Sequence, residues 1–317
     1  MKKTMRSILV AGAVAVSFSV PVHAAEFINI LTGGTSGVYY PLGVALSQIY
    51  GKAIPGSKTS VQATKASAEN LNLLQAGRGE AAISLGDSLS DAWKGNEEAG
   101  FKSPLKKLRT IATLYPNYIH FVATADSGIK SLADIKGKRI SVGAPKSGTE
   151  LNVREILKAA GISYKDFSKV EYLSYAESVE LMKNKQLDVT LLSSGLGVAA
   201  LRDLAVSQKV NFLTIPAEIV AKINDPAFLV GVIPAKTYEG QNSDVTTVSV
   251  FNYLVTHEGV STDTVYTMTK SMFENLDQMS AAHSAAKAIK KENAAKTPPA
   301  PLHPGAEKYY REIGLIK

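Results

Sequence analysis

The chain has 317 residues, of which 45% are hydrophobic, and its formal net charge is +7. This length is enough for two lobes of ordinary domain size. The chain contains no cysteine, which excludes disulfides, thiol catalysis and cysteine-bound zinc. Its lysines are spread over the sequence without an aromatic-interleaved basic stripe, so we do not expect nucleic-acid binding.

The first 24 residues have the pattern of an export signal. Lys2 and Lys3 precede an apolar run over residues 8–20, and the run is followed by the small-x-small sequence ending at Ala24. The apolar run has 13 residues, whereas a membrane-spanning helix needs about 20. A membrane anchor is the alternative, but we expect cleavage after Ala24 and a periplasmic protein.

Short β-rich runs then alternate with segments of helical periodicity. The predicted strands are 27–31, 59–63, 81–85, 110–115, 119–123, 139–142, 170–173, 189–192, 210–215, 229–233 and 246–255. Helices are expected between many of them, including 88–94, 149–160, a helix with a Ser174–Glu177 capping box, 261–276 and 306–313. This alternation predicts an α/β architecture with largely parallel sheets.

A glycine-rich turn follows the first strand. It reads Thr-Gly-Gly-Thr-Ser-Gly-Val-Tyr-Tyr over residues 32–40 and opens an amphipathic helix. Glycines let the backbone approach a ligand closely, and the first amides of a helix have no intrahelical partner. No Gly-Lys-Ser/Thr sequence follows, so the turn predicts binding of a small anion and not phosphoryl transfer.

A second strand–glycine–helix turn spans residues 143–149. Thr149 is the predicted N-cap of the following helix and Gly161 its C-terminal stop. A simple turn between a strand and a helix is the alternative interpretation. Two such turns that face each other across a cleft would hold a small acid as clamshell receptors do.

Two further motifs have weak chemical interpretations. Gly86-Asp87-Ser88-Leu89 matches a serine esterase signature, but the Asp-x-x-His pair of that family is missing, so we do not expect catalysis. Asp87 can instead cap a helix or face a ligand cleft. Residues 195–200 imitate a dinucleotide-binding fingerprint without the acidic residue that should follow it.

No metal or cofactor site is expected. The sequence after His257 lacks the second histidine of a zinc-binding helix, and no acidic calcium loop is present. His303, which lies in a proline-rich segment, is interpreted as a structural loop residue.

Several blocks in order closely resemble the TAXI family (TRAP-associated extracytoplasmic immunogenic proteins), the solute-binding receptors of one class of TRAP transporters. The blocks span nearly the whole chain after the signal: residues 32–43, 67–71 (Ser-Ala-Glu-Asn-Leu), 112–116 (Ala-Thr-Leu-Tyr-Pro), 131–139, 147–149 and 301–310 (Pro-Leu-His-Pro-Gly-Ala-Glu-Lys-Tyr-Tyr). The first and last blocks are the specific ones.

The resemblance implies an α/β, two-lobed type II periplasmic-binding-protein fold with two crossing hinge strands. The crossings should lie near 115–122 and 246–255, with lobe one formed by 25–115 and 246–317 and lobe two by 116–245. Relatives bind glutamate, glutamine, 2-oxoglutarate or similar carboxylates and deliver them to a membrane permease.

The resemblance also implies the residues that line the cleft. By position they are Gly34, Thr35, Tyr39, Ser67, Asn70, Asp87, Tyr115, Ser147, Gly148, Thr149, Ser194 and Gly195. The family usually has small residues before the Ser67 position, where this chain has Lys65 and Ala66. We add Lys65 as a candidate partner of a ligand carboxylate, although a solvated lysine is the alternative.

The sequence therefore predicts a non-enzymatic periplasmic receptor for a small carboxylate or amino acid. Its partner would be a TRAP permease with fused small and large subunits. A sensory module that uses the same clamshell to signal to a membrane receptor is the second hypothesis, and a hydrolase built on Ser88 is the third.

Overall fold

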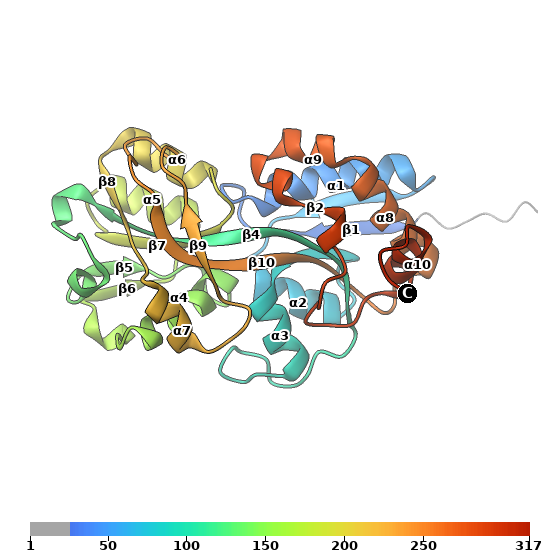
Figure 1. Ribbon diagram of the computed structural model, residues 1–317, viewed down its shortest axis with the longest axis horizontal. Helices are drawn as coiled ribbons and strands as arrows, with labels where there is room; N and C mark the ends of the chain where they lie inside the picture. Colours follow the sequence, from blue (N-terminus) through green and yellow to red (C-terminus); the bar gives the residue numbers. More distant parts are fainter. Residues whose placement is uncertain (1–25) are drawn as a thin grey trace, which may run out of the picture.

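The computed structural model describes residues 26–317, so the predicted export signal lies outside the described residues. The described chain forms two α/β lobes that are joined by two long strands running from one lobe into the other (Figure 1). This arrangement confirms the predicted fold class. Between residues 26 and 317, no helix has both the length and the apolar character that crossing a membrane requires.

Lobe one is built from both ends of the described chain. Its elements are β1 (Phe27–Leu31), α1 (Tyr39–Ala53), β2 (Lys58–Gln62), α2 (Ser67–Gln75), β3 (Ala81–Leu85), α3 (Gly86–Lys94), α8 (Thr262–Glu274), α9 (Leu276–Ala282) and α10 (Pro304–Glu312). Strand β3 is buried along its whole length, which explains its predominantly apolar sequence.

Lobe two is built from the middle of the chain. Its elements are β5 (Arg139–Ser141), α4 (Gly148–Ala159), β6 (Lys169–Glu171), α5 (Tyr175–Lys183), β7 (Val189–Ser194), α6 (Ala199–Ser207), β8 (Val210–Leu213), α7 (Ala217–Ile223) and β9 (Leu229–Ile233). Strands β4 (Leu108–Thr124) and β10 (Val245–His257) run through both lobes. The exact lobe boundaries given above stay predictions.

One sheet continues through the molecule in the order β2-β1-β3-β10-β4-β7-β5-β6, with β8 beside β4 and β9 beside β10. Pairing is parallel within β2-β1-β3 and within β7-β5-β6. The pairs that involve β4 or β10 are antiparallel. The expected parallel character therefore holds only for the outer strands of each lobe.

Strand β4 differs from the sequence-based expectation. We predicted separate strands at 110–115 and 119–123, but β4 continues without a break through Pro116, which is paired with Phe251 of β10. On its other side, β4 pairs with β7 only from Tyr118 onward. A proline lacks the N–H that a central strand donates, but it is tolerated where the ladder is open on one side.

The helix starts explain most of the local structure. The predicted Ser174–Glu177 capping box of α5 is confirmed. The N-cap of α4 is Ser147, whose hydroxyl accepts from the Glu150 amide at 3.1 Å, so the prediction of Thr149 was wrong. Gly161 adopts a positive φ of 69° after α4, as predicted for its stop.

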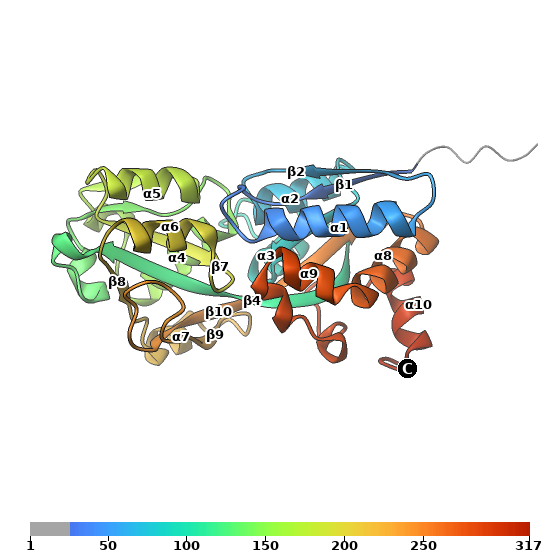
Figure 2. The same cartoon turned by 90° about the horizontal axis from the view of Figure 1, so that it is seen from above.

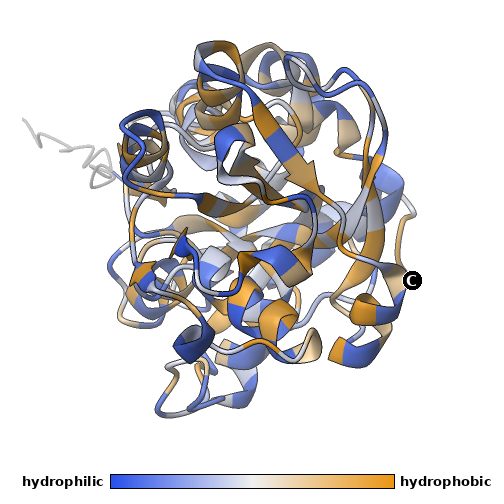
Figure 3. Ribbon diagram, turned by 90° about the vertical axis from the view of Figure 1, so that its left-hand side faces the viewer, coloured by the Kyte–Doolittle hydropathy of each residue, from blue (hydrophilic) through white to orange (hydrophobic). Residues whose placement is uncertain are grey.

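Each lobe has an apolar core between the sheet and its covering helices. Hydrophobic residues dominate the strands, and the helices alternate between hydrophobic and hydrophilic positions (Figure 3). Apolar packing also continues across the lobe boundary: Leu85 of lobe one packs in a cluster of mainly lobe-two residues, Leu151 of α4 packs in a cluster of lobe one, and the remaining cluster contains residues of both lobes. This reciprocal packing places the lobes in direct contact.

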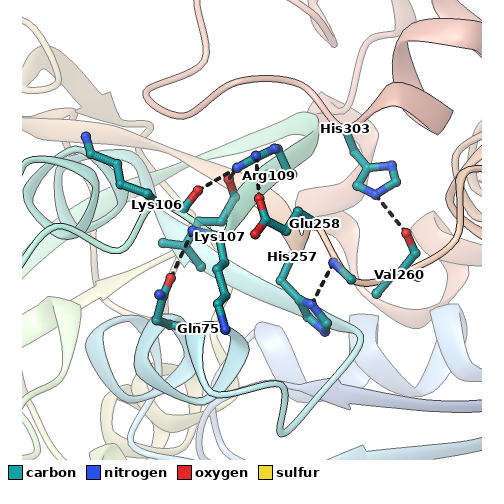
Figure 4. A network of polar contacts seen from close by, with 10 residues as sticks. Gln75, Lys106, Lys107, Arg109, His257, Glu258, Val260 and His303 are labelled. Carbon is teal, nitrogen blue, oxygen red and sulfur yellow. Dashed lines mark hydrogen bonds and ion pairs between the residues drawn. The ribbon is translucent and has the colours of Figure 1, made fainter.

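The end of lobe one that includes the start of β4 is held by polar contacts (Figure 4). Arg109 of β4 forms an ion pair of 2.7 Å with Glu258, just after β10. One ring nitrogen of His303 accepts from the Gly305 amide at the start of α10, and the other lies 3.0 Å from the Val260 carbonyl. His303 is thus a structural residue, as its sequence context predicts.

Candidate ligand-binding cleft

A cavity of about 130 Å³ lies between the two lobes. Lobe one contributes the turn before α1, the turn before α2 and the end of β3. Lobe two contributes the turn before α4, the start of α5 and the end of β7. The lining residues are Gly33, Gly34, Ser36–Tyr39, Thr64–Ser67, Leu85, Ala144, Ser147–Thr149, Ser174, Tyr175, Ser193 and Ser194.

Four helix N-termini meet at this cavity. Helices α1 and α2 begin at it from lobe one, and α4 and α5 begin at it from lobe two. Figure 2 shows α1 in one lobe and α5 in the other. The first amides of a helix lack intrahelical partners and carry partial positive charge. The cavity is therefore suited to an anion.

The two lobes differ in how these helix starts are capped. In lobe two, Ser147 and Ser174 accept hydrogen bonds from amides of α4 and α5. In lobe one, α1 and α2 begin without a side-chain capping bond. Their first amides are thus the ones that a bound ligand is best placed to satisfy.

The lining is electropositive. Among the described lining residues, Lys65 is the single charged side chain and no carboxylate is present. Lys65 is exposed, so it lies at the rim, and its backbone amide donates to Glu69 at 2.6 Å. A cation at the mouth and helix amides inside would attract and hold a negative group.

The tyrosines of the cleft are neutral and held in place, with Tyr39 buried and Tyr175 half-buried. Burial raises the pKa of Tyr39 well above its ordinary value and raises the pKa of Tyr175 to about 12. The Tyr175 hydroxyl lies 2.7 Å from Thr149 Oγ1 and donates to the Ser193 carbonyl at 2.7 Å. Tyr175 therefore links α5, α4 and β7 into one wall.

Ser193 contributes a buried polar group to the wall of the cavity. It lines the cavity, is buried, and has no hydrogen-bond partner among residues 26–317. A buried polar atom without a partner is unfavourable unless something else satisfies it. The Ser193 hydroxyl is thus an unused hydrogen-bonding group in the cavity wall, and the sequence did not predict it.

The backbone of Ala66 is strained. This residue precedes α2 with φ 71° and ψ −144°, a region that glycine occupies readily and alanine does not. Strain of this kind is concentrated at functional sites.

Of the predicted cleft residues, eight line the cavity. They are Gly34, Tyr39, Lys65, Ser67, Ser147, Gly148, Thr149 and Ser194. Their direct contact with a ligand stays a prediction. The sequence did not predict four other lining residues: Thr64, Ser174, Tyr175 and Ser193. Ser174 and Tyr175 could have been found, because they open a helix after a strand as residues 147–149 do.

The other five predicted residues lie outside the lining, and their ligand contacts also stay predictions. Thr35 is exposed in the first turn, and Gly195 follows the lining residue Ser194. Asn70 is buried, and its amide donates to the carbonyls of Thr32 at 2.8 Å and Ile83 at 2.9 Å. Tyr115 is buried in β4, with no partner for its hydroxyl in the described chain.

Asp87 lies outside the lining of the ligand cavity, and its contact with a ligand stays a prediction. It makes no helix-capping bond, because α3 begins at Gly86 with Leu85 before it. It is 4% exposed and accepts a hydrogen bond of 2.6 Å from Asn152 Nδ2 of α4. The adjacent Ser88 of the esterase-like motif is fully buried and its hydroxyl has no partner in the described chain.

The lobes approach each other closely at Gly148. A Cβ atom at this position would lie 2.6 Å from Leu85 Cδ1 and 2.6 Å from Ser67 Oγ, both in lobe one. Glycine is therefore required for the observed closeness.

Within residues 26–317, no three His, Asp or Glu side chains are arranged to hold a metal ion.

Solved structures of periplasmic binding proteins share this fold. The periplasmic binding protein BugD is similar with a TM-score of 0.59 and 11% identity, over 92% of this chain and 95% of that one. A protein from Bordetella bronchiseptica RB50 gives a TM-score of 0.57 and 14% identity, over 91% and 98%. The alkanesulfonate-binding protein SsuA from Xanthomonas axonopodis pv. citri, bound to MOPS, gives 0.51 and 14%, over 93% and 96%.

At these identities the likeness establishes the fold and not the ligand. The family comparison is based on the sequence itself: the profile of the NMT1-like family matches residues 30–314. This match includes both lobes, the crossing strands and every residue of the cavity lining. The chain belongs to the NMT1-like family.

Proposed function

We propose that this protein is a periplasmic solute-binding receptor that captures a small carboxylate by closure of its two lobes. The observation that carries the proposal is the convergence of four helix N-termini, two from each lobe, on one cavity without a carboxylate. An anion that contacts both pairs stabilises the closed state, because its contacts with the second lobe form only on closure.

The size of the cavity limits the ligand. Its volume is about 130 Å³, and a protein cavity of about 150 Å³ holds benzene. The ligand should therefore be a compact acid such as glutamate, glutamine or 2-oxoglutarate. The carboxylate would bind at the uncapped starts of α1 and α2, Ser193 would bind a second polar group, and Tyr39 and Tyr175 would cover the carbon chain.

The membrane partner is proposed from the resemblance to the TAXI receptors, which implies a permease of the TRAP class driven by an ion gradient. Structures of similar fold include the binding protein of an ABC phosphonate transporter from Pseudomonas aeruginosa (TM-score 0.52) and a putative L-cystine ABC transporter from Listeria monocytogenes (TM-score 0.51). Uptake by vesicles that contain the membrane permease served by this receptor would separate the two classes. Uptake driven by an ion gradient without ATP supports the TRAP proposal, and strict ATP dependence contradicts it.

The ligand proposal is tested with protein that has been unfolded, dialysed and refolded, so that no ligand from the host is retained. Thermal shift and calorimetry would compare C3–C6 carboxylates and amino acids with uncharged sugars of similar size. Binding to the native state alone raises stability by about 2.7 kcal/mol at a hundredfold excess over Kd. Binding of sugars but of no acid contradicts the proposal.

Lys65 provides a matched pair of variants. Lys65→Gln should weaken binding of a dicarboxylate about 2- to 5-fold, as a rim charge does. Lys52→Gln, in the last turn of α1, removes the same charge away from the lining and should not change the affinity. Equal effects of both variants would show that Lys65 has no specific role.

A further inference from the structure

A second cavity separates α3 of lobe one from α4 of lobe two. It has a volume of about 290 Å³, and it does not share lining residues with the ligand cavity. Asp87 lies on its wall, where the side chain is only 4% exposed. The cavity is thus a place where the two lobes meet through polar groups.

Asp87 and Asn152 form one hydrogen bond across the lobe interface and leave two oxygens without one. Asn152 Nδ2 donates to Asp87 Oδ2 at 2.6 Å. Asp87 Oδ1 and Asn152 Oδ1 are both buried and have no hydrogen-bond partner in residues 26–317. Two acceptors without a donor are unfavourable at a buried interface.

Protonation of Asp87 supplies the donor that these two oxygens lack. Protonated Asp87 has an O–H donor on Oδ1 while Oδ2 still accepts from the Asn152 amide. The Oδ1–H group can then donate to Asn152 Oδ1, which gives a reciprocal acid–amide pair with all four polar groups satisfied. Ionised Asp87 cannot form the second bond.

The surrounding charges favour this proton. The charged groups on the cavity wall are Asp91 of α3, Glu98 after α3, Arg154, Glu155 and Lys158 of α4, and Asp225 after α7. Arg154 is already paired with Glu150 at 2.7 Å, and no cation in the described part of the chain forms an ion pair with Asp87. Burial, with smaller contributions from Asp91 and Asp225, raises the pKa of Asp87 to about 7, although the backbone amides of Ser88 and Asp87 act to lower it.

We propose that Asp87 and Asn152 form a proton-dependent clasp, in which closure of the lobes takes up one proton that Asp87 Oδ1 donates to Asn152 Oδ1. The proposal rests on the proposed function in one respect, namely that lobe closure is the step that captures the ligand. When the lobes separate, Asp87 returns to water at the start of α3 and its pKa falls towards the ordinary value.

The linkage has a definite sign. Because the closed state binds the proton more tightly than the open state, acidification favours closure over the interval between the open-state and closed-state pKa values. The closure equilibrium constant should rise at least about tenfold between pH 8 and pH 5.5. A receptor of this kind holds its ligand more tightly in a more acidic periplasm.

The test measures closure directly and without any ligand. The chain has no cysteine, so Lys102→Cys and Lys165→Cys, at exposed positions of lobe one and lobe two, accept a pair of nitroxide labels without background. The distance between the labels would be measured from pH 5.5 to pH 8.5 in the full mature chain. The wild-type sequence should show a growing short-distance population as the pH falls.

Three variants make the result specific. Asp87→Asn keeps the shape and can form an amide–amide pair with Asn152, so its closed population should not change with pH. Asn152→Leu removes the clasp and should give a smaller closed population at every pH. Asp91→Asn, a neighbouring carboxylate outside the clasp, should keep the pH response.

Two results overturn the proposal. One is a wild-type distance distribution that does not change with pH, and the other is an Asp87→Asn variant that keeps the full response. Because no ligand is added, either result is distinct from a failure of the carboxylate screen, which concerns the other cavity.

Discussion

The hydroxyl of Tyr39 donates a hydrogen bond of 2.5 Å to Asn252 Oδ1 and thereby connects the cleft to the crossing strand β10. Asn252 Nδ2 donates to the Tyr115 carbonyl and to Asn117 Oδ1 of β4, both at 2.8 Å. One fully buried amide thus joins the start of α1 to both crossing strands. A change in the twist of these strands is transmitted to the cavity wall through this contact.

Replacement of Asn252 by leucine should destabilise the protein strongly. The variant leaves Tyr39, Tyr115 and Asn117 without their partner in the interior, which we expect to cost about 2–4 kcal/mol. Tyr39→Phe removes one hydroxyl from the same contact and should cost about 1 kcal/mol. Urea unfolding measures both values, and equal stability of the two variants would contradict the role assigned to Asn252.

Gly148→Ala should hinder closure without unfolding either lobe. The added methyl group meets Ser67 and Leu85 across the cleft, and we expect ligand affinity to fall about tenfold or more. Gly51→Ala, in α1 with no neighbour of the added Cβ closer than 3.4 Å, is the matched control. It should leave binding unchanged. Calorimetry with the best ligand of the screen gives the comparison, and unaltered binding by Gly148→Ala would exclude the observed contact from the bound state.

Ala66→Gly should raise the free energy of unfolding by up to about 1 kcal/mol, because relief of the positive φ exceeds the added entropy of the unfolded chain. Ala76→Gly, at the end of α2 with φ −85°, carries the entropic cost without the relief and should lower stability by about 0.5 kcal/mol. Thermal unfolding of both variants checks the difference. A loss of stability in Ala66→Gly would show that the alanine conformation is not strained.

His120 should make the protein sensitive to acid. It is fully buried in β4, its Nε2 lies 2.9 Å from the Tyr238 hydroxyl, and burial lowers its pKa to about 4. A depressed pKa in the folded state stabilises the fold above the ordinary histidine value, and this stability is lost as the pH falls through about 6.5 towards 4. The full effect is about 3 kcal/mol.

Urea unfolding between pH 7 and pH 4.5 in wild type and His120→Gln measures this contribution. The variant should be less stable at pH 7 and should lose less stability on acidification. An identical pH dependence in the two proteins would assign the acid sensitivity to other groups. Asp87 acts in the opposite direction, since its raised pKa adds stability on acidification, so the Asp87→Asn background isolates the histidine.

The sequence predicts the elements of this fold better than their connections. Strand 81–85 was predicted with its observed bounds, because a short apolar run between turns has few alternatives. Pro116 divided β4 in the prediction, since the local rule for proline cannot indicate that one side of the strand is open. Hydroxyl residues stand on both sides of Gly148, and either one could cap α4. The sequence does not indicate which of them does so, and in the structure the N-cap is Ser147.

The candidate site was predicted where it depends on local turns. Gly34 and Ser67 lie in strand–helix turns whose sequence is characteristic, and both line the cavity. Tyr175 and Ser193 come to the cavity from separate elements of lobe two, and no periodicity indicates that they meet. Asp87 was expected to face a cleft or cap a helix, whereas its partner lies 65 residues away in sequence, a relationship that only the tertiary structure contains.

The discontinuous construction of lobe one determines the order in which the protein can fold. Strand β3 pairs with β10, and α8 and α9 cover α1, so the first lobe lacks a sheet neighbour and part of its helical layer until residues beyond 245 are present. Lobe two has most of its strands by residue 233. During synthesis from the N-terminus, lobe two would therefore fold first. Lobe one would complete its fold only after the C-terminal residues are present.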